Sequence, residues 1–107
     1  MAFRVELSAR AVRNLRGIHG TVAAGGGRQA AEWFDRLLLA ITTLRENPGR
    51  CPQTPEDHTA RHLLFGRGRF VCRVIFDIDD AGHVVNVLHV RHGSQQPLDY
   101  TEGETST

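Results

Sequence analysis

The chain has 107 residues, of which 40% are hydrophobic and 23% charged, as expected for one globular domain without room for two independent cores. Its net charge of +1 excludes a polycation that coats DNA without specificity. The amino terminus does not resemble a signal peptide, and no apolar run approaches the roughly 20 residues of a membrane helix. We therefore expect a cytoplasmic protein that is not bound to a membrane.

The first elements along the chain are a short strand and an amphipathic helix. Phe3, Val5 and Leu7 alternate with polar residues, which predicts a half-buried strand. Ser8 suits the N-cap of the helix that follows. Apolar residues of this helix recur near helical spacing at Val12, Leu15, Ile18 and Val22. Another stripe holds Arg10, Arg13 and Arg16, which is either a solvated helix face or a contact for an acidic partner or an RNA backbone.

A glycine-rich break and a second helix come next. Ala23-Ala24-Gly25-Gly26-Gly27 predicts a turn, because glycine has the greatest backbone freedom. The helix after it has the clearest apolar periodicity of the sequence, at Ala30, Trp33, Phe34, Leu37, Leu38, Ile41 and Leu44. Asn47-Pro48-Gly49 ends it. The two helices are expected to form an antiparallel hairpin whose apolar residues belong to the core, with some area left for a partner to cover.

The second half of the chain reads as a loop followed by three strands. Residues 50–59 contain two prolines and no periodicity. Strands are predicted at Arg61–Phe65, Phe70–Ile78 and Val84–Arg91, with turns at 66–68 and 79–82, so an antiparallel meander is expected. We expect both cysteines to be reduced, Cys51 in the loop and Cys72 in the core. The single domain is expected to span residues 1–99, and 100–107 to be a polar tail.

The order β-α-α-β-β-β predicts an α+β fold, with the helical hairpin packed on one face of a small, mainly antiparallel sheet. Strand alternation directs Cys72 and Val74 toward the helices and Arg73 toward the opposite, open face. On the last strand the same alternation gives Val87, His89 and Arg91 one common face. A shared site with Arg73 requires that this face is also the open one.

Basic residues accumulate in this half of the chain. From residue 58 to residue 76 there is no acidic residue, whereas this segment contains Arg61, Arg67, Arg69 and Arg73. Arginine forms forked hydrogen bonds with phosphate or carboxylate. The plainer alternatives are an ion pair of Arg73 with Asp77, Asp79 or a tail acid, and a solvated hairpin tip for Arg67 and Arg69.

His89 and His92 would point to opposite faces of a strand, so we expect no metal site.

Four segments together resemble the RelE/ParE superfamily of bacterial toxins, often labelled plasmid-stabilisation proteins: FRVELSARAVRNLRGI, AAEWFDRLLLAITTLRENPGRCP, RHLLFGRGRFVCRVIFDI and VVNVLHVRHGSQQPL. The resemblance covers about residues 3–98 in the same element order. It implies the toxin of a type II toxin–antitoxin pair, neutralised by an acidic antitoxin encoded next to it, without a cofactor. One branch of the superfamily cleaves mRNA on the ribosome and another inhibits DNA gyrase. An inactive relative that only binds an antitoxin is a third possibility.

For the RNA-cleaving branch the resemblance also implies roles for individual residues. The 2′-OH of the RNA is the nucleophile in this metal-independent reaction, so the protein supplies charge stabilisation and proton transfer. Arg73 would hold the scissile phosphate, Arg91 would stabilise the transition state and His92 would transfer a proton. The residues expected to bind nucleic acid are Arg61, Arg67, Arg69 and His89. However, Ser94 or Gln95 stands where this branch has a second arginine, so RNA cleavage and gyrase inhibition both stay open.

Overall fold

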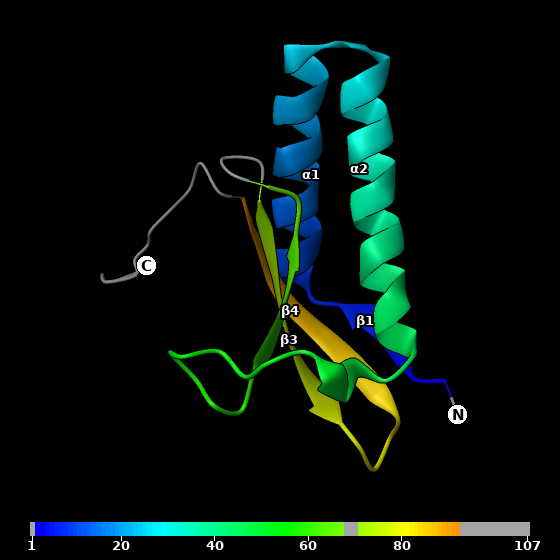
Figure 1. Cartoon of the computed structure of the whole chain (residues 1–107), viewed down its shortest axis with the longest axis vertical. Coiled ribbons are helices and arrows are strands. Elements are labelled where there is room, and N and C mark those ends of the chain that lie inside the picture. The colour runs from blue at the N-terminus through cyan, green and yellow to red at the C-terminus, as the bar shows by residue number, and fades with distance from the viewer. Residues whose placement is uncertain (1, 68–70, 93–107) are drawn as a thin grey trace.

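The computed structural model describes residues 2–67 and 71–92. Its elements, in chain order, are β1 (Arg4–Leu7), α1 (Ala9–Gly25), α2 (Gly27–Thr42), two short 3-10 helices (Thr43–Arg45 and Pro48–Arg50), β2 (Arg61–Phe65), β3 (Cys72–Asp79) and β4 (Val84–His92). Figure 1 shows α1 and α2 side by side as a hairpin against one sheet face, which confirms the predicted α+β fold.

The predictions for Arg69, Phe70 and the tail concern residues outside the described ranges. No helix in the described part of the chain is both long and apolar enough to span a membrane.

The four strands form one sheet in the order β1-β4-β3-β2. β2, β3 and β4 are the predicted antiparallel meander. β1 lies parallel to β4, with Val5 opposite Val85, so the sheet is mixed at this edge. A parallel pair needs a long crossover connection, and here the helical hairpin begins that connection.

The turn between the helices is tighter than the sequence pattern suggests. α1 continues through Ala23 and Ala24 to Gly25, and α2 begins at Gly27, so Gly26 alone separates them. Gly26 has a φ of 91°, a value that residues with a Cβ atom rarely adopt. The predicted cap of α1 is confirmed, because the Ser8 hydroxyl accepts a hydrogen bond from the Ala11 backbone N–H at 2.9 Å.

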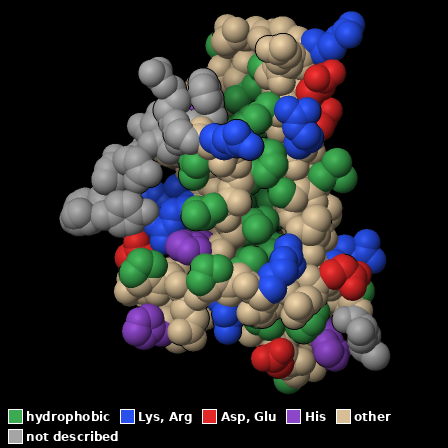
Figure 2. Space-filling view, in the orientation of Figure 1, with side chains coloured by type: hydrophobic (Ala, Val, Ile, Leu, Met, Phe, Trp, Pro, Cys, Tyr) green, Lys and Arg blue, Asp and Glu red, His purple; other side chains and the backbone are tan. Residues whose placement is uncertain are grey.

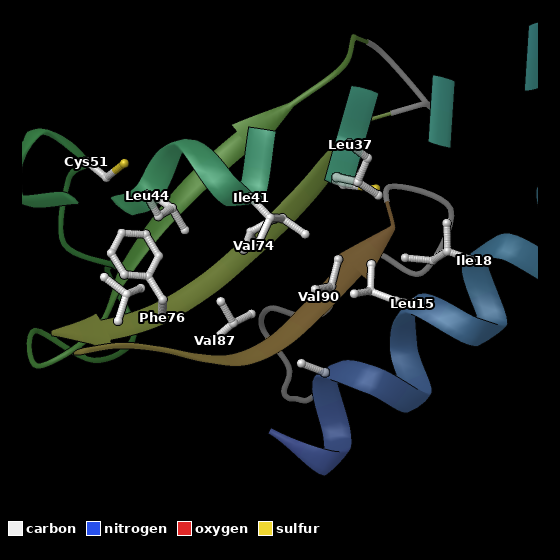
Figure 3. Close-up of a cluster of buried hydrophobic side chains, with 13 residues drawn as sticks. Leu15, Ile18, Leu37, Ile41, Leu44, Cys51, Val74, Phe76, Val87 and Val90 are labelled. Atoms are coloured by element: carbon white, nitrogen blue, oxygen red, sulfur yellow. The ribbon is translucent and has the colours of Figure 1, made fainter. Parts of the chain in front are cut away.

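The core lies between the hairpin and the sheet (Figure 3). Its most buried side chains come from both helices, from the segment after α2 and from the two central strands; they include Leu15, Leu37, Ile41, Leu44, Val74, Phe76, Val85, Val87 and Val90. Burying one such side chain stabilises the fold by about 1.5–3 kcal/mol relative to leaving it exposed. Cys72 is fully buried as predicted, Cys51 is buried directly after the second 3-10 helix, and both thiols are free.

A β-bulge interrupts the pairing of β3 with β4. Ile75 lies opposite His89, whereas the next residue, Phe76, lies opposite Val87, so Leu88 is an extra residue on β4. This extra residue reverses the alternation of side chains along β4.

As a result, the predicted common face of Val87, His89 and Arg91 is wrong for Val87. Val87 is fully buried in the core, opposite Phe76, whereas Arg91 lies opposite Arg73 on the other face. Strict two-residue periodicity holds on either side of the bulge but not across it.

Candidate functional site

The face of the sheet turned away from α1 and α2, here called the far face, carries two rows of side chains. The register places Leu64, Arg73 and Arg91 in one row across β2, β3 and β4, and His62, Ile75 and His89 in the next. Residues directly opposite each other on neighbouring strands have Cβ atoms about 5 Å apart. We call these six residues the far-face cluster. It brings together three of the residues singled out from the sequence: Arg73, Arg91 and His89.

Arg73 is held by a carboxylate and an imidazole. Its two terminal nitrogens donate to the two carboxylate oxygens of Glu56 at 2.9 and 3.2 Å, and its Nε donates to His62 Nδ1 at 3.0 Å. Only 11% of the Arg73 side chain is exposed, against 45% for Glu56. Arg73 lies opposite the helices as predicted, but Glu56 in the loop before β2 is the acid that pairs with it, not Asp77 or Asp79.

This contact sets the charge state of both partners of Arg73. The hydrogen bond from Arg73 lowers the pKa of Glu56, so its carboxylate is ionised at neutral pH. The pKa of His62 is lowered by burial and by the charge of Arg73. Because His62 Nδ1 accepts a hydrogen bond, the ring is neutral with its proton on Nε2.

His89 is also neutral at physiological pH. Burial lowers its pKa to about 4, and the charges of Arg10, Arg91 and Arg73 act in the same direction while Glu56 opposes them. Its Nδ1 atom is buried and has no hydrogen-bond partner among the described residues. At neutral pH this ring offers no positive charge to a phosphate.

Two further residues of the predicted site lie on the helix-covered face of the sheet. His92 is opposite Cys72, and its ring packs edge-on against Trp33 of α2, with 6.1 Å between the ring centroids. Arg61 is opposite Phe76, and its Nη1 donates to the carbonyl oxygens of Cys51 at 2.5 Å and Gly49 at 3.4 Å. Neither side chain joins Arg73, although the prediction that His89 and His92 face opposite ways is confirmed.

Two arginines of the predicted site remain, Arg67 and Arg69. Arg67 is exposed just after β2, and Arg69 is outside the described ranges. In the view of Figure 2, basic side chains are scattered over the surface with acidic and hydrophobic ones between them. The described residues contain no group of three histidine, cysteine or acidic side chains that could hold a metal ion.

Sequence reasoning missed two members of this site. His62, which is not among the residues singled out from the sequence, lies two residues before Leu64 on β2, so alternation along β2 places it on the face of Arg73. Glu56 lies in an aperiodic loop, and no pattern in the sequence links it to a strand residue 17 positions later.

Comparison with solved structures identifies the class of fold. The chain is similar to the chromosomal ParDE toxin–antitoxin system of P. aeruginosa, with a TM-score of 0.68 and 16% identity over 85% of this chain and 96% of that one. It is also similar to a mutant of the E. coli toxin RelE in the free state (TM-score 0.61, 18% identity, 86% and 84% covered). The toxin–antitoxin complex RelBE2 of Mycobacterium tuberculosis gives a TM-score of 0.57 and 22% identity, with 86% and 92% covered. A search of curated proteins finds no match.

Residues 5–97 match the family described as "ParE toxin of type II toxin-antitoxin system, parDE". The chain therefore belongs to this family and is a toxin of the RelE/ParE superfamily, as the resemblance of its segments predicts. A toxin of this kind has an antitoxin as its partner.

Proposed function

We propose that this toxin inhibits growth by binding and blocking DNA gyrase, as the ParE branch does, and that it does not cleave RNA. One observation carries the proposal: His92 lies on the helix-covered face of the sheet, whereas Arg73 and Arg91 lie on the far face. RNA cleavage needs a proton-transfer group within hydrogen-bond reach of the phosphate that the arginines hold. Arg73, Arg91 and His92, the three residues predicted for the catalytic site, therefore do not face one common phosphate.

The histidines that do lie beside Arg73 are poor substitutes for His92. A general acid or base works best when its pKa lies near the operating pH. The pKa of His89 is about 4, and the pKa of His62 is also lowered, with its Nδ1 already occupied by Arg73. A toxin that acts by binding alone has no need of such a group, and the match to the ParE toxin family supports the same interpretation.

RNA cleavage is the second candidate, because Arg73 and Arg91 lie directly opposite each other on neighbouring strands. Two guanidinium groups at this spacing suit the charge of a phosphate in its transition state. In this alternative Arg73 holds the phosphate, Arg91 stabilises the transition state, and Arg67 and Arg69 bind the RNA backbone.

A supercoiling assay with purified gyrase tests the proposal. Relaxed plasmid, ATP and gyrase are incubated with increasing amounts of the purified toxin. We expect supercoiling to fall with toxin dose and to recover when the toxin is first mixed with its antitoxin, which we expect to be the acidic protein encoded next to it. The same preparation should leave the message of a translation reaction intact. Full gyrase activity at excess toxin, together with cleaved message, would contradict gyrase inhibition.

A further inference from the structure

The contact between Glu56 and Arg73 has the form that arginine uses to bind a carboxylate from another molecule. Both terminal nitrogens are engaged, at 2.9 and 3.2 Å, with one carboxylate oxygen each. Such forked pairs are directional and stronger than single hydrogen bonds. Here the carboxylate comes from the chain itself, so the site that Arg73 offers is occupied by an internal group.

The loop that carries Glu56 is anchored on both sides of this residue. Thr54 is 2% exposed and Ala60 is 3% exposed, and the Thr54 N–H donates to the Ala60 carbonyl at 2.9 Å. The Thr54 hydroxyl also donates to the Asp57 carbonyl at 2.6 Å. Glu56 lies between these anchors and is exposed. A change in the conformation of Pro55 and Glu56 therefore removes the carboxylate from Arg73 and loosens the contact of Thr54 with Asp57, while the backbone bond between Thr54 and Ala60 stays in place.

The surroundings of Arg73 indicate what takes the place of Glu56. Leu64, directly opposite Arg73 on the edge strand β2, is 58% exposed. The far-face cluster contains no phenylalanine, tyrosine or tryptophan, the larger aromatic side chains on which unpaired bases stack, and neither of its two histidines is exposed. A guanidinium beside an exposed leucine is instead complementary to a peptide that carries an acidic residue next to an apolar one.

We propose that Glu56 is an internal competitor of an acidic peptide segment of the protein partner. The peptide's carboxylate replaces Glu56 at Arg73, its apolar neighbour covers Leu64, and the tip of the loop between Thr54 and Ala60 moves away. Because the peptide must first displace Glu56, it binds less tightly than it would if Glu56 did not compete for Arg73. This exchange concerns the partner side of the toxin and does not depend on gyrase being the target.

Isothermal titration of the purified full chain with a synthetic peptide of repeated Leu-Glu-Glu units tests the exchange. Glu56→Gln removes the competing charge while keeping the size of the side chain. Because exposed ion pairs contribute up to about 1 kcal/mol, we expect this variant to bind the peptide roughly two- to five-fold more tightly than the wild type. The matched control is Glu32→Gln, an equal charge change at an exposed position of α2, which should bind like the wild type.

Hydrogen exchange gives an independent readout of the loop. The Asp57 N–H donates to the Thr54 hydroxyl at 3.0 Å, and this bond should open more often when Glu56 leaves Arg73. We expect saturating peptide to speed exchange at Asp57 several-fold. Equal peptide affinity of Glu56→Gln and Glu32→Gln would overturn the proposal. So would tighter binding of Glu56→Gln to a single-stranded RNA oligomer without tighter binding to the peptide, since the occupant would then be a phosphate.

Discussion

At the scale of single residues, His89 is the group of the site whose charged form is most strongly disfavoured by burial. It lies on β4 within the influence of the charges of Arg10, Arg91 and Arg73, and its Nδ1 is buried without a hydrogen-bond partner in the described part of the chain. Burial and positive neighbours both oppose its protonation, so its pKa falls from 6.5 to about 4. The fold therefore holds this ring neutral at the cost of stability in acid.

The pH dependence of stability tests this account of His89. Above pH 6.5 the ring is neutral in both the folded and the unfolded chain, and its titration has no effect. As the pH falls toward 4, the unfolded chain takes up a proton that the folded chain refuses, so the wild type loses stability. Between pH 7 and pH 4.5 we expect the free energy of unfolding to fall by about 2 kcal/mol more in the wild type than in His89→Gln. Urea unfolding measures this difference.

Because other groups titrate in the same range, only the difference between the two proteins is diagnostic. The pKa of Glu56 and that of Asp57 are also lowered, and both residues are present in both proteins. Parallel loss of stability in the wild type and in His89→Gln, or an NMR titration of His89 near pH 6.5, would contradict a buried neutral ring.

Sequence patterns predict the positions of single side chains well where they follow the strand period. Arg73 lies opposite the helices because its neighbours Cys72 and Val74 are apolar, and this much is readable from the sequence. The pairing of Arg73 with Glu56 cannot be predicted from the sequence, because that contact depends on the path of a loop with no periodicity. The charge state of His89 likewise depends on its burial and then on the charge of Arg10, and only the tertiary fold produces both.

At the scale of elements, the bulge in β4 decides which residues share a face. The start of α1 satisfies backbone groups around the bulge: the Ser8 hydroxyl donates to the Leu88 carbonyl at 2.6 Å, and Asn14 Oδ1 accepts from the Val90 N–H at 3.0 Å. Backbone groups that a bulge leaves without strand partners need such substitutes when they are buried. The bulge is thus a joint property of β4 and α1, which explains why the alternation of β4 alone does not predict it.

Ser8 is the residue whose removal tests this junction. Its hydroxyl both caps α1, by accepting from the Ala11 N–H, and donates to the bulge at Leu88. We expect Ser8→Ala to lower the free energy of unfolding by about 1–2 kcal/mol, since N-cap losses alone cost about 1 kcal/mol. Chemical denaturation of both proteins measures the change.

The control for Ser8 is Thr42→Ala at the end of α2. The Thr42 hydroxyl makes one exposed hydrogen bond, to the Leu39 carbonyl at 2.6 Å, so its loss should cost less than about 0.5 kcal/mol. If Ser8→Ala were as stable as this control, the hydroxyl of Ser8 would not hold α1 to the bulge.

At the scale of the whole molecule, the sheet separates two environments. The helix-covered face holds the core together with His92 and Arg61, whereas the far face holds Arg73, Arg91 and His89. Composition and periodicity predict the two layers, since the apolar stripes of both helices and the core side of β3 are plain in the sequence. Which of the two faces carries His89 and which carries His92 depends on the bulge in β4 and is beyond those patterns, although their lying on opposite faces is not.

Exposed apolar side chains lie on both layers. Leu38 and Leu39 of α2 are 38% and 64% exposed, and Leu64 of the far face is 58% exposed. The expectation that a partner covers apolar area of the helices stays a prediction, and Leu64 adds a second such position beside Arg73. A partner that contacts both layers would have to cross an edge of the sheet.

Mapping of mRNA 5′ ends after induction of the toxin tests the separation of His92 from the arginines most directly. Wild type and His92→Gln are induced without antitoxin, and primer extension is carried out on translated messages. If the toxin acts by binding its target, both proteins arrest growth and neither produces new ends within codons. New ends that appear with the wild type and vanish with a folded His92→Gln protein would show that His92 transfers a proton, and would contradict the account given above.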